Sequence, residues 1–435
     1  MMVKSTLQSL IESGVYEQIY RCVHCGYCLE SCPARDANYF DVFGSRGKML
    51  VFKALLESKL QITEIFSDRI LNCALCRWCT YKCPEEIPTD DVFITMRHEI
   101  AEKNQMPPIV KKVVDNILKK KNPFGSLASR RTLWAKKLNL VNSAETVIFA
   151  SCMNTMMGYL DFIHTFGLSF NTLARMADIL EKLKLDNLVV IGGQLLNLNK
   201  QYHQTLRNAV QLLQKIGIKV GYLFDEEPCC GKPLHTYGYL TEFQEYARWV
   251  SRLIKDKGIK KLIMVNPVCA YTFKVLYPKF VDDFDVEVNH IVEVLDKNLD
   301  KWSSTASYDN HVLLTYHDPC YMSRYMSLIE QPRRILRSIK NVTFVESEKS
   351  RMNTYCTGDG GIEITHPKTA KKIAQKRIEM LLKTQAKVIS TACPACISML
   401  KYGLKLANKE QKVQIKDLID LVYEGVTLRE QAEKV

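Results

Sequence analysis

The spacing of apolar residues changes near residue 145 and divides the chain into two kinds of structure. Before that point, apolar positions recur at helical intervals over residues 1–20 and again over 46–72. Between Arg46 and Lys59, the residues at this spacing are Met49, Leu50, Phe52, Leu55 and Leu56. The pattern predicts an N-terminal region built from helices.

Beyond residue 145, short apolar runs typical of buried strands alternate with longer amphipathic segments typical of helices. The predicted strands are Thr146–Ala150, Asn187–Ile191, Lys219–Phe224, Lys261–Val265, His311–Tyr316, Val342–Val345 and Lys387–Thr391. The predicted helices between them include Thr205–Ile216, Thr241–Lys257 and Lys368–Thr384. Because this rhythm indicates parallel sheets flanked by helices, we expect an α + α/β protein with the all-helical part first.

Two cysteine quartets with identical spacing lie in the helical region. They are Cys22, Cys25, Cys28 and Cys32, followed by Pro33, and Cys73, Cys76, Cys79 and Cys83, followed by Pro84. Each reads C-x2-C-x2-C-x3-C-P, the bacterial-ferredoxin ligand run for [4Fe–4S] clusters, in which the fourth cysteine binds the other cluster. The expected ligand groups are Cys22, Cys25, Cys28 with Cys83, and Cys73, Cys76, Cys79 with Cys32. A disulfide framework or zinc is disfavoured by the chain length and by the compressed spacing.

The other eight cysteines follow predicted strands, which is where open α/β sheets place their chemistry. In the C-terminal half the chain reads His317-Asp318-Pro319-Cys320, then Tyr355-Cys356-Thr357-Gly358-Asp359-Gly360-Gly361, then Ala392-Cys393-Pro394-Ala395-Cys396. Earlier it reads Cys152 after the first strand, then Glu227-Pro228-Cys229-Cys230-Gly231, then Asn266-Pro267-Val268-Cys269. The glycines after Cys356 suit a close approach of the backbone to a cluster.

With these motifs the chain resembles the cysteine-rich CCG-domain family over essentially its whole length. That family includes heterodisulfide reductase catalytic subunits and the iron–sulfur subunits of glycolate, lactate and anaerobic glycerol-3-phosphate oxidation. The resemblance implies two CCG repeats behind a two-cluster ferredoxin. The long helical insert between the quartets indicates the all-helical ferredoxin type of succinate dehydrogenase-like subunits. We therefore expect a ferredoxin domain at 1–105, a basic linker at 106–145, and CCG-like α/β repeats at 146–305 and 306–435.

Both repeats depart from the family pattern of an opening cysteine, a Cys-Cys-Gly and a Cys-x2-Cys. In heterodisulfide reductases these five thiolates hold a non-cubane cluster that attacks a disulfide. In the second repeat Thr357 replaces one cysteine, and the remaining four are enough for one cubane or a zinc site. These four are Cys320, Cys356, Cys393 and Cys396.

The first repeat retains Cys229, Cys230 and Cys269, with Asn266 at a lost ligand position. Its opening position is ambiguous, because Cys152 lies 77 residues before Cys229, whereas the corresponding spacing in the second repeat is 36. Spacing favours Gly193 as the lost cysteine, which would make the stretch around Cys152 an added strand and helix. A cluster at this set, with or without Cys152, and a degenerate remnant that is free or zinc-bound are both open alternatives.

Composition adds constraints on partners and location. The chain has 60 Lys and Arg against 47 Asp and Glu, a formal net charge of +13, which two anionic clusters reduce to about +9. This charge fits an acidic partner or an anionic membrane surface, whereas no nucleic-acid module accompanies it. Sixteen cysteines with no targeting segment indicate a reducing compartment, so we expect a cytoplasmic protein, peripheral on the inner face of a membrane.

No apolar stretch reaches the length of a membrane span. The nearest, Val147 to Asn171, favours a buried core element over a membrane-surface or partner-docking helix. The basic stretch from Lys111 to Lys137 indicates a solvated connector, with a partner or lipid contact as the alternative.

Three functions fit these features. The first is an electron-transfer subunit that links a flavoprotein or thiol/disulfide site to a quinone or cytochrome partner. The second is a catalytic heterodisulfide reductase subunit, which the losses at Asn266 and Thr357 disfavour. The third is a non-catalytic anchoring or assembly subunit, which the complete N-terminal quartets disfavour. His317 and Asp318 are candidates for orienting the Cys320 loop, and His235 for moving protons.

Overall fold

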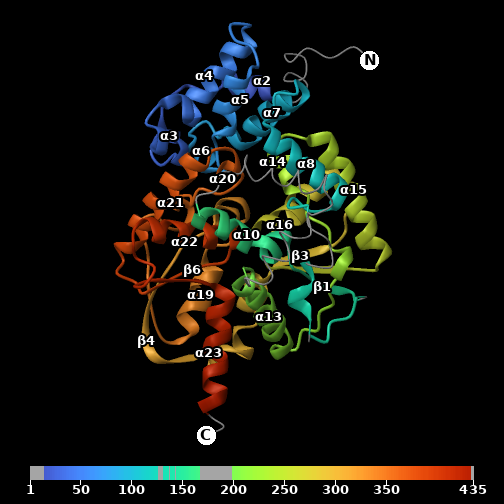
Figure 1. Ribbon diagram of the computed structural model, residues 1–435, viewed down its shortest axis with the longest axis vertical. Helices are drawn as coiled ribbons and strands as arrows, with labels where there is room; N and C mark the ends of the chain where they lie inside the picture. Colours follow the sequence, from blue (N-terminus) through green and yellow to red (C-terminus); the bar gives the residue numbers. More distant parts are fainter. Residues whose placement is uncertain (1–13, 126–130, 137, 143, 167–197, 433–435) are drawn as a thin grey trace.

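The computed structural model describes residues 14–125, 131–136, 138–142, 144–166 and 198–432. Its N-terminal helices lie at one end of the molecule, and two α/β units lie side by side beneath them (Figure 1). The N-terminal helices are α2 (Val15–Tyr20), α3 (Pro33–Asn38), α4 (Ser45–Leu56), α5 (Glu64–Leu71), α6 (Trp78–Lys82) and α7 (Thr89–Glu102), with 3-10 turns η1 (Tyr27–Leu29) and η2 (Asp41–Phe43). No strand occurs in the described part of residues 1–105, so the helical ferredoxin region is confirmed.

The first α/β unit is built on parallel strands β1 (Thr146–Phe149), β2 (Lys261–Met264) and β3 (Glu287–His290), in the order β1-β2-β3. Gly221 forms an isolated parallel bridge with Val147 on the outer side of β1. The other elements of this unit are η3 (Leu133–Ala135), α10 (Cys152–Phe166), α13 (Lys200–Lys215), η4 (Phe224–Glu226), α14 (Lys232–Thr236), α15 (Leu240–Asp256), α16 (Pro267–Tyr271), η5 (Thr272–Leu276), α17 (Tyr277–Phe280), α18 (Ile291–Lys297), η6 (Leu299–Lys301) and η7 (Ser303–Thr305).

The second unit has parallel strands β4 (Ser307–Tyr316), β5 (Lys340–Val345), β6 (Val388–Thr391) and β7 (Gln414–Asp417), in the order β5-β4-β6-β7. Its helical elements are η8 (Tyr321–Tyr325), α19 (Glu330–Ser338), η9 (Arg351–Asn353), α20 (Ile362–Thr365), α21 (Pro367–Leu382), α22 (Pro394–Leu406) and α23 (Leu418–Ala432). Both units have the predicted parallel sheets, which confirms the α + α/β class.

Several predicted elements differ from the observed ones. The strand expected at Lys219–Phe224 is reduced to the bridge at Gly221 and is followed by η4. The strand expected at Asn187–Ile191 lies outside the described residues. Strands β3 and β7 were not predicted, because each is a four-residue edge strand with polar residues. An edge strand lacks the long apolar run on which the sequence-based prediction relied.

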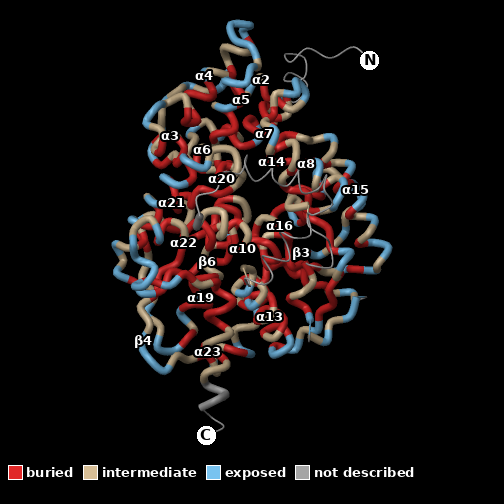
Figure 2. Tube along the Cα trace, in the orientation of Figure 1, coloured by how far each residue is buried: buried red, intermediate tan, exposed pale blue. Residues whose placement is uncertain are grey.

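A hydrophobic core extends across the predicted domain boundaries. One cluster of buried residues joins Phe52 and Phe93 of the N-terminal helices to Leu262 of the first sheet and Ile373 of the second unit. Figure 2 shows these buried segments continuing from the N-terminal helices into both α/β units. The N-terminal module therefore packs against the rest of the chain.

The predicted basic linker begins as a packed helix. Helix α8 (Pro108–Lys120) buries Val110, Val113, Val114 and Ile117 in that shared core, while its lysines stay on the outer face. The carbonyl oxygen of Lys121 then accepts a hydrogen bond from the backbone N–H of Cys229 at 2.7 Å. This part of the segment is a structural element joined to a cysteine loop, not a solvated connector.

Helix α10 shows what the apolar stretch from Val147 does. Met156, Met157 and Leu160 are buried, and the helix packs against α13 and against α22 of the second unit. The buried-core interpretation therefore holds for the described residues of this stretch. No helix in the described ranges is sufficiently long and apolar to cross a bilayer.

His290, at the end of β3, is buried and held in its neutral form. Its Nδ1 accepts a hydrogen bond from the backbone N–H of Val292, and its Nε2 lies 3.2 Å from the carbonyl oxygen of Val265. Burial lowers the pKa of His290 to about 4; Glu293 raises the pKa and Lys274 lowers it by smaller amounts. Since a protonated Nδ1 cannot accept, protonation would break the N-terminal cap of α18.

We expect this histidine to make the protein sensitive to acid. Its folded pKa lies below the unfolded value of about 6.5, so its stabilising contribution is complete above that pH and is lost as the pH falls toward 4. The contribution is up to about 3 kcal/mol of unfolding free energy. His290→Asn keeps a capping oxygen and should flatten the pH dependence in urea unfolding between pH 7 and 4.5. His311→Asn, at an exposed histidine, is the control, and equal pH slopes in both variants would contradict the expectation.

Candidate metal centres

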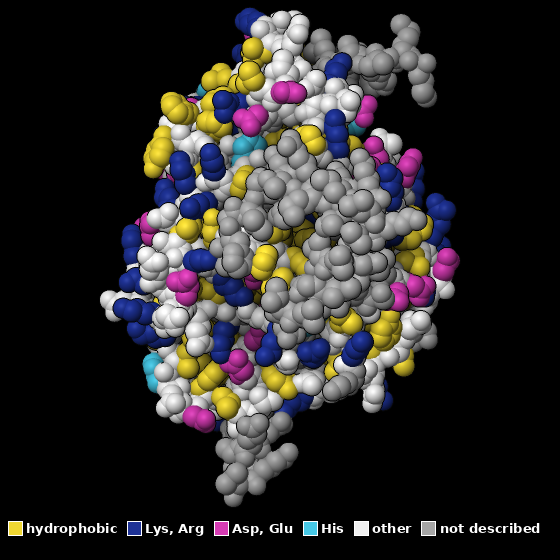
Figure 3. Space-filling view, viewed as in Figure 1, with side chains coloured by type: hydrophobic (Ala, Val, Ile, Leu, Met, Phe, Trp, Pro, Cys, Tyr) yellow, Lys and Arg dark blue, Asp and Glu magenta, His cyan; other side chains and the backbone are white. Residues whose placement is uncertain are grey.

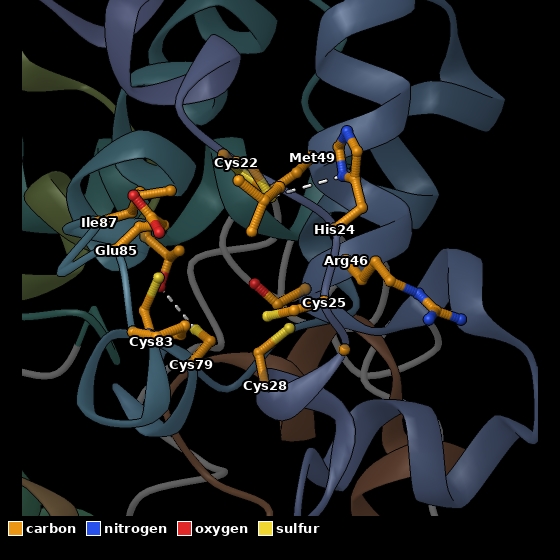
Figure 4. Close-up of a pocket in the computed structure, with 15 residues that line it drawn as sticks. Cys22, His24, Cys25, Cys28, Arg46, Met49, Cys79, Cys83, Glu85 and Ile87 are labelled. Atoms are coloured by element: carbon orange, nitrogen blue, oxygen red, sulfur yellow. Dashed lines mark hydrogen bonds between the residues drawn. The ribbon is translucent and has the colours of Figure 1, made fainter.

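The first quartet and the end of the second surround one cavity. Cys22, Cys25, Cys28 and Cys83 line it, as Figure 4 shows, and Cys79 lines it as well. Cys22 and Cys25 come from the loop after α2, and Cys28 lies in η1. Cys83 follows α6 and is brought here because α6 packs against η1. The structure thus gathers the four thiols that the crossed pairing predicts.

The remaining members of the quartets line a second cavity. Cys32, Cys73, Cys76 and Cys79 lie there, and the electrostatic neighbours of Cys32 are Cys73 and Cys76. Thr89 donates a hydrogen bond to the sulfur of Cys79 at 2.8 Å. Burial raises the pKa of Cys32 to about 12. A thiol removed from water in this way has its thiolate disfavoured unless a cation offsets the charge.

Three buried cations supply positive charge at this second cavity. Lys48 lines it and donates to the carbonyl oxygen of Asn72 at 2.7 Å. Arg97 donates to the carbonyl oxygen of Cys73 at 2.8 Å, and Arg324 donates to that of Cys76 at 2.6 Å. Within the described residues, none of the three forms an ion pair, and two of their guanidinium nitrogens, Arg97 Nε and Arg324 Nη2, lack a hydrogen-bond partner.

This donor set fits an anionic iron–sulfur cluster. Buried cations without carboxylate partners are costly, and a [4Fe–4S]2+ core with four thiolates carries about −2 charge that offsets them. Lys48, Arg97 and Arg324 were not predicted from the sequence. Lys48 directly precedes Met49 on the apolar face of the predicted helix at 46–59. A lysine on an apolar face is the sequence feature that could have indicated its role.

The second CCG-like set lies at the carboxyl edge of the second sheet. Cys320 follows β4, Cys356 follows η9, and Cys393 and Cys396 lie at the start of α22. All four are buried. Cys393 and Cys396 present their sulfurs within 4.8 Å of each other and of a carboxylate oxygen of Asp359. The structure therefore brings two of the four predicted C-terminal cysteines together with one oxygen donor, while Cys320 and Cys356 lie outside that group of three.

Asp359 was not predicted, because only the glycines around it stood out in the sequence. Its carboxylate accepts from the Cys396 thiol at 3.6 Å, and burial raises its pKa to about 6. Gly360 beside it approaches the second quartet, where a Cβ would lie 2.5 Å from the carbonyl oxygen of Ala74. The expected close backbone approach thus occurs against the quartet loop.

His317 and Asp318 hold the Cys320 loop in place. Asp318 accepts two hydrogen bonds from Arg333 at 2.7 and 2.9 Å, and its carbonyl oxygen accepts one from Thr354, two residues before Cys356. His317 Nδ1 accepts from Arg377 at 3.1 Å. Burial, with Arg377 beside it, holds the pKa of His317 well below its usual range. These contacts agree with the orienting role that the sequence suggested.

The first CCG-like set is also assembled, and it includes Cys152. The sulfur of Cys152 lies 3.9 Å from that of Cys229, and the sulfur of Cys269 lies 3.4 Å from that of Cys230. The amide of Asn266 donates to Ser151, and its side-chain oxygen caps α16 by accepting from Val268. Where the family has a ligand, Asn266 therefore has a structural role.

The topology of the described residues points to a different opening position from the one that spacing favours. Strand β1 takes the place of β4, since Gly221, β1, β2 and β3 follow the same order as β5, β4, β6 and β7. Cys152 follows β1 as Cys320 follows β4, which makes Cys152 a candidate for the opening position. The extra length lies after Cys152, between α10 and α13. Gly193 lies outside the described residues.

Two buried titratable residues, Glu227 and His235, lie next to this set of cysteines. The backbone N–H groups of Ala150 and Ser151 donate to the Glu227 carboxylate at 2.7 and 3.0 Å, which fixes the loop before Cys152. Burial raises the pKa of Glu227 to about 8. His235 is buried and 3.1 Å from Lys232, and burial with that neighbour keeps its pKa well below the usual range. A histidine that stays neutral and enclosed is poorly placed to exchange protons with solvent.

The loops of the second quartet and of the second CCG-like set are in direct contact. Arg324, four residues after Cys320, donates hydrogen bonds to the carbonyl oxygens of Cys76 at 2.6 Å and of Thr354 at 2.8 Å. Cys356 and Arg324 both lower the pKa of Cys76. Tyr325 donates to the carbonyl oxygen of Leu75 at 2.7 Å. Its ring stacks on Tyr321, 4.5 Å between centroids, and lies 4.7 Å from the ring of Tyr271, which follows Cys269. Three cysteine sets thus meet at one group of tyrosines.

Family models match the parts of the chain that carry these cysteines. A 4Fe-4S dicluster domain matches residues 18–87, and a cysteine-rich domain, CCG, matches twice, at 194–274 and 314–401. The chain belongs to the CCG-domain iron–sulfur proteins. As a dicluster protein of this family, it has two [4Fe–4S] clusters in its N-terminal module, and its C-terminal cysteines are consistent with a further cluster.

Curated relatives of this CCG-domain protein are redox proteins. It is 24% identical to a subunit of the dihydromethanophenazine:CoB–CoM heterodisulfide reductase of Methanosarcina barkeri, over 94% of both chains. It is also 24% identical to the EtfAB:quinone oxidoreductase of Syntrophomonas wolfei subsp. wolfei, over 93% of this chain and 58% of that protein. It is 26% identical to the probable iron-sulfur-binding oxidoreductase FadF of Bacillus subtilis, over 83% of this chain and 47% of that protein. The CCG-domain protein is thus an iron–sulfur oxidoreductase subunit, and it spans about half the length of the latter two relatives.

Proposed function

We propose that this protein is an electron relay in a redox complex, peripheral on the cytoplasmic face of a membrane. Electrons pass between a flavoprotein or thiol/disulfide site and a quinone or cytochrome partner. In this proposal Cys22, Cys25, Cys28 and Cys83 bind the first cubane, and Cys32, Cys73, Cys76 and Cys79 bind the second. Cys320, Cys356, Cys393 and Cys396 bind a further cluster. The names of the curated relatives support redox partners of this kind.

The contacts of Arg324 carry the proposal. Arg324, four residues after Cys320, donates to the carbonyl oxygen of Cys76 in the second quartet at 2.6 Å and to that of Thr354, two residues before Cys356, at 2.8 Å. Clusters held by these two sets would lie next to each other in the interior of the protein. Such proximity suits electron transfer and has no evident use in a purely anchoring subunit.

The catalytic alternative receives less support from the same residues. Asn266 is engaged as a helix cap, and the Thr357 hydroxyl points to the Cys396 sulfur at 3.5 Å. Both lost ligand positions thus have other uses, and neither set retains five thiolates for a non-cubane cluster. The first set consists of two close pairs of thiols, Cys152 with Cys229 at 3.9 Å and Cys230 with Cys269 at 3.4 Å.

Metal content measured on anaerobically purified protein tests the proposal. We expect at least about twelve iron atoms per chain, with about four lost in Cys396→Ser. Cys229→Ser is the matched variant for the first repeat and should leave those twelve in place. If Cys396→Ser loses zinc and no iron, the relay ends at the second cubane and the proposal fails.

A further inference from the structure

Exposed apolar side chains are concentrated in one part of this protein. Among the described residues, the large apolar side chains with high exposure are Tyr20, Val23, Tyr27, Tyr39, Phe40, Leu50, Leu60, Ile65 and Tyr81 in the N-terminal module, and only Val141 and Trp249 elsewhere. Tyr39 is 81% exposed and Phe40 68% exposed. Figure 3 shows apolar side chains next to Lys and Arg over the upper left of the molecule, where α3 and α4 lie in Figure 1. Clustered exposure of this kind marks interaction surfaces.

The same region contains the outermost cysteine. All sixteen cysteines lie in described residues, and Cys25 alone among them is exposed. Cys25 lines the first cavity, so among the described sites the first cubane site has the most exposed ligand. An electron carrier that docks here would come close to that ligand.

Arg46 connects the Cys25 loop to the aromatic residues. It lies against Gly26, where a Cβ would be 3.1 Å from its Nη1, and it forms an ion pair with Asp41. Asp41 directly follows Tyr39 and Phe40. Helix α4, which carries Arg46, also presents Leu50 and Lys53. We call the surface made by Val23, Tyr27, Tyr39, Phe40 and Lys53 the port.

The charge at the port is positive. Arg46, which reaches the Cys25 loop at Gly26, and Lys53 both extend from α4. Lys53 lies over the ring of Tyr20, 5.2 Å from its centroid, and within the described residues neither Lys53 nor Arg21 forms an ion pair. Aromatic side chains mixed with cations are typical of protein interfaces, and unpaired cations at an interface favour carboxylates on the partner.

We infer that the port docks a one-electron carrier protein that surrounds its own redox group with carboxylates. The inference rests on the proposed relay function and names the class of partner that exchanges electrons with the first cubane. In the transfer step, one electron leaves the carrier and converts a [4Fe–4S]2+ core to [4Fe–4S]+. For a flavin carrier, the anionic hydroquinone gives up this electron and becomes the neutral semiquinone without releasing a proton.

Stopped-flow reduction by photoreduced flavodoxin, an acidic flavoprotein, tests this inference on the full protein loaded with its clusters. Lys53→Glu should slow cluster bleaching at least tenfold at low salt, and raising the salt concentration should slow the unmodified protein similarly. Phe40→Ser combined with Tyr39→Asn should slow cluster bleaching severalfold. Asparagine is chosen at position 39 because it tolerates the left-handed backbone there. The matched controls are Lys219→Glu and Trp249→Ser in the first α/β unit, whose bleaching rates should stay within twofold of that of the unmodified protein.

Dithionite reduction of the same samples separates this inference from the proposed function. We expect dithionite to bleach the clusters of every variant at the same rate, because a small reductant needs no docking surface. If dithionite fails to reduce the unmodified protein, the relay function itself fails. If Lys53→Glu behaves like Lys219→Glu with flavodoxin, the port is wrong while the relay stands.

Two other occupants would also overturn the inference. Flotation with vesicles of phosphatidylcholine and phosphatidylserine that is lost in Lys53→Glu would assign the port to a membrane surface. Self-association in sedimentation velocity that is lost in the Phe40→Ser, Tyr39→Asn variant would assign it to a second copy of this chain. We expect neither.

Discussion

Replacing Cys32 with serine should remove about four iron atoms per chain, and those of the second cubane rather than the first. Cys32 belongs by sequence to the quartet that begins at Cys22, but it lines the cavity of Cys73, Cys76 and Cys79. Removing one of four thiolate ligands from a buried cubane site leaves an iron without its ligand beside uncompensated cations. We therefore expect complete loss of that cluster, measured as iron and sulfide content.

Double variants identify which cluster is lost without any spectroscopic assignment. Cys32→Ser combined with Cys73→Ser should lose no more iron than either single variant, because both residues serve the same cluster. Cys32→Ser combined with Cys22→Ser should lose about eight iron atoms, because these residues serve different clusters. The opposite pattern would show that each quartet binds its own cluster, and the crossed grouping would be wrong.

Replacing Lys48 with methionine should lower the reduction potential of the second cubane by roughly 60 mV or more. A buried unit charge near a redox site contributes on the order of 1–4 kcal/mol at an effective dielectric of about 20, and a tenfold change in a one-electron equilibrium is about 59 mV. Lys48 favours the reduced cluster because reduction adds negative charge beside its ammonium group. An EPR-monitored redox titration in a Cys22→Ser background observes the second cubane without the first.

Two lysine variants control for packing and for remote charge. Lys48→Arg keeps the charge, so the reduction potential of the second cubane should stay close to that of the unmodified protein. Lys53→Met removes a charge from the same helix at the port and should leave that reduction potential unchanged. If Lys48→Met and Lys48→Arg shift the potential equally, the side chain acts through packing and the electrostatic account is wrong.

The local motifs were readable from the sequence because they depend on short-range geometry. Three cysteines with two residues between each can bind one cluster whatever surrounds them. Helical and strand periodicity likewise follow from backbone geometry. Strands β1, β2, β4, β5 and β6 and the helices between them were therefore predicted to within a few residues. The edge strands β3 and β7 were missed because their residues are half polar.

The first repeat illustrates how residue counts can mislead. Cys152 and Cys229 are separated by α10, α13 and the residues between these helices, so the spacing in the chain does not report the 3.9 Å between their sulfurs. Only the pairing of β1 with β2 and with Gly221 identifies β1 as the counterpart of β4. Parallel sheets bring their carboxyl ends together regardless of the length of the connections.

The sequence by itself determined that this protein carries two cubane motifs, two parallel α/β repeats and eight further cysteines. The tertiary structure decided which cysteines line a common cavity, that Arg324 joins the Cys76 loop to the Cys356 loop, and that Lys48, Arg97 and Arg324 lie beside the second cavity. It also decided that the first site has the most exposed ligand, Cys25. Electrostatic fields and contacts depend on distances between residues remote in the chain, and those distances are set by packing of the shared core.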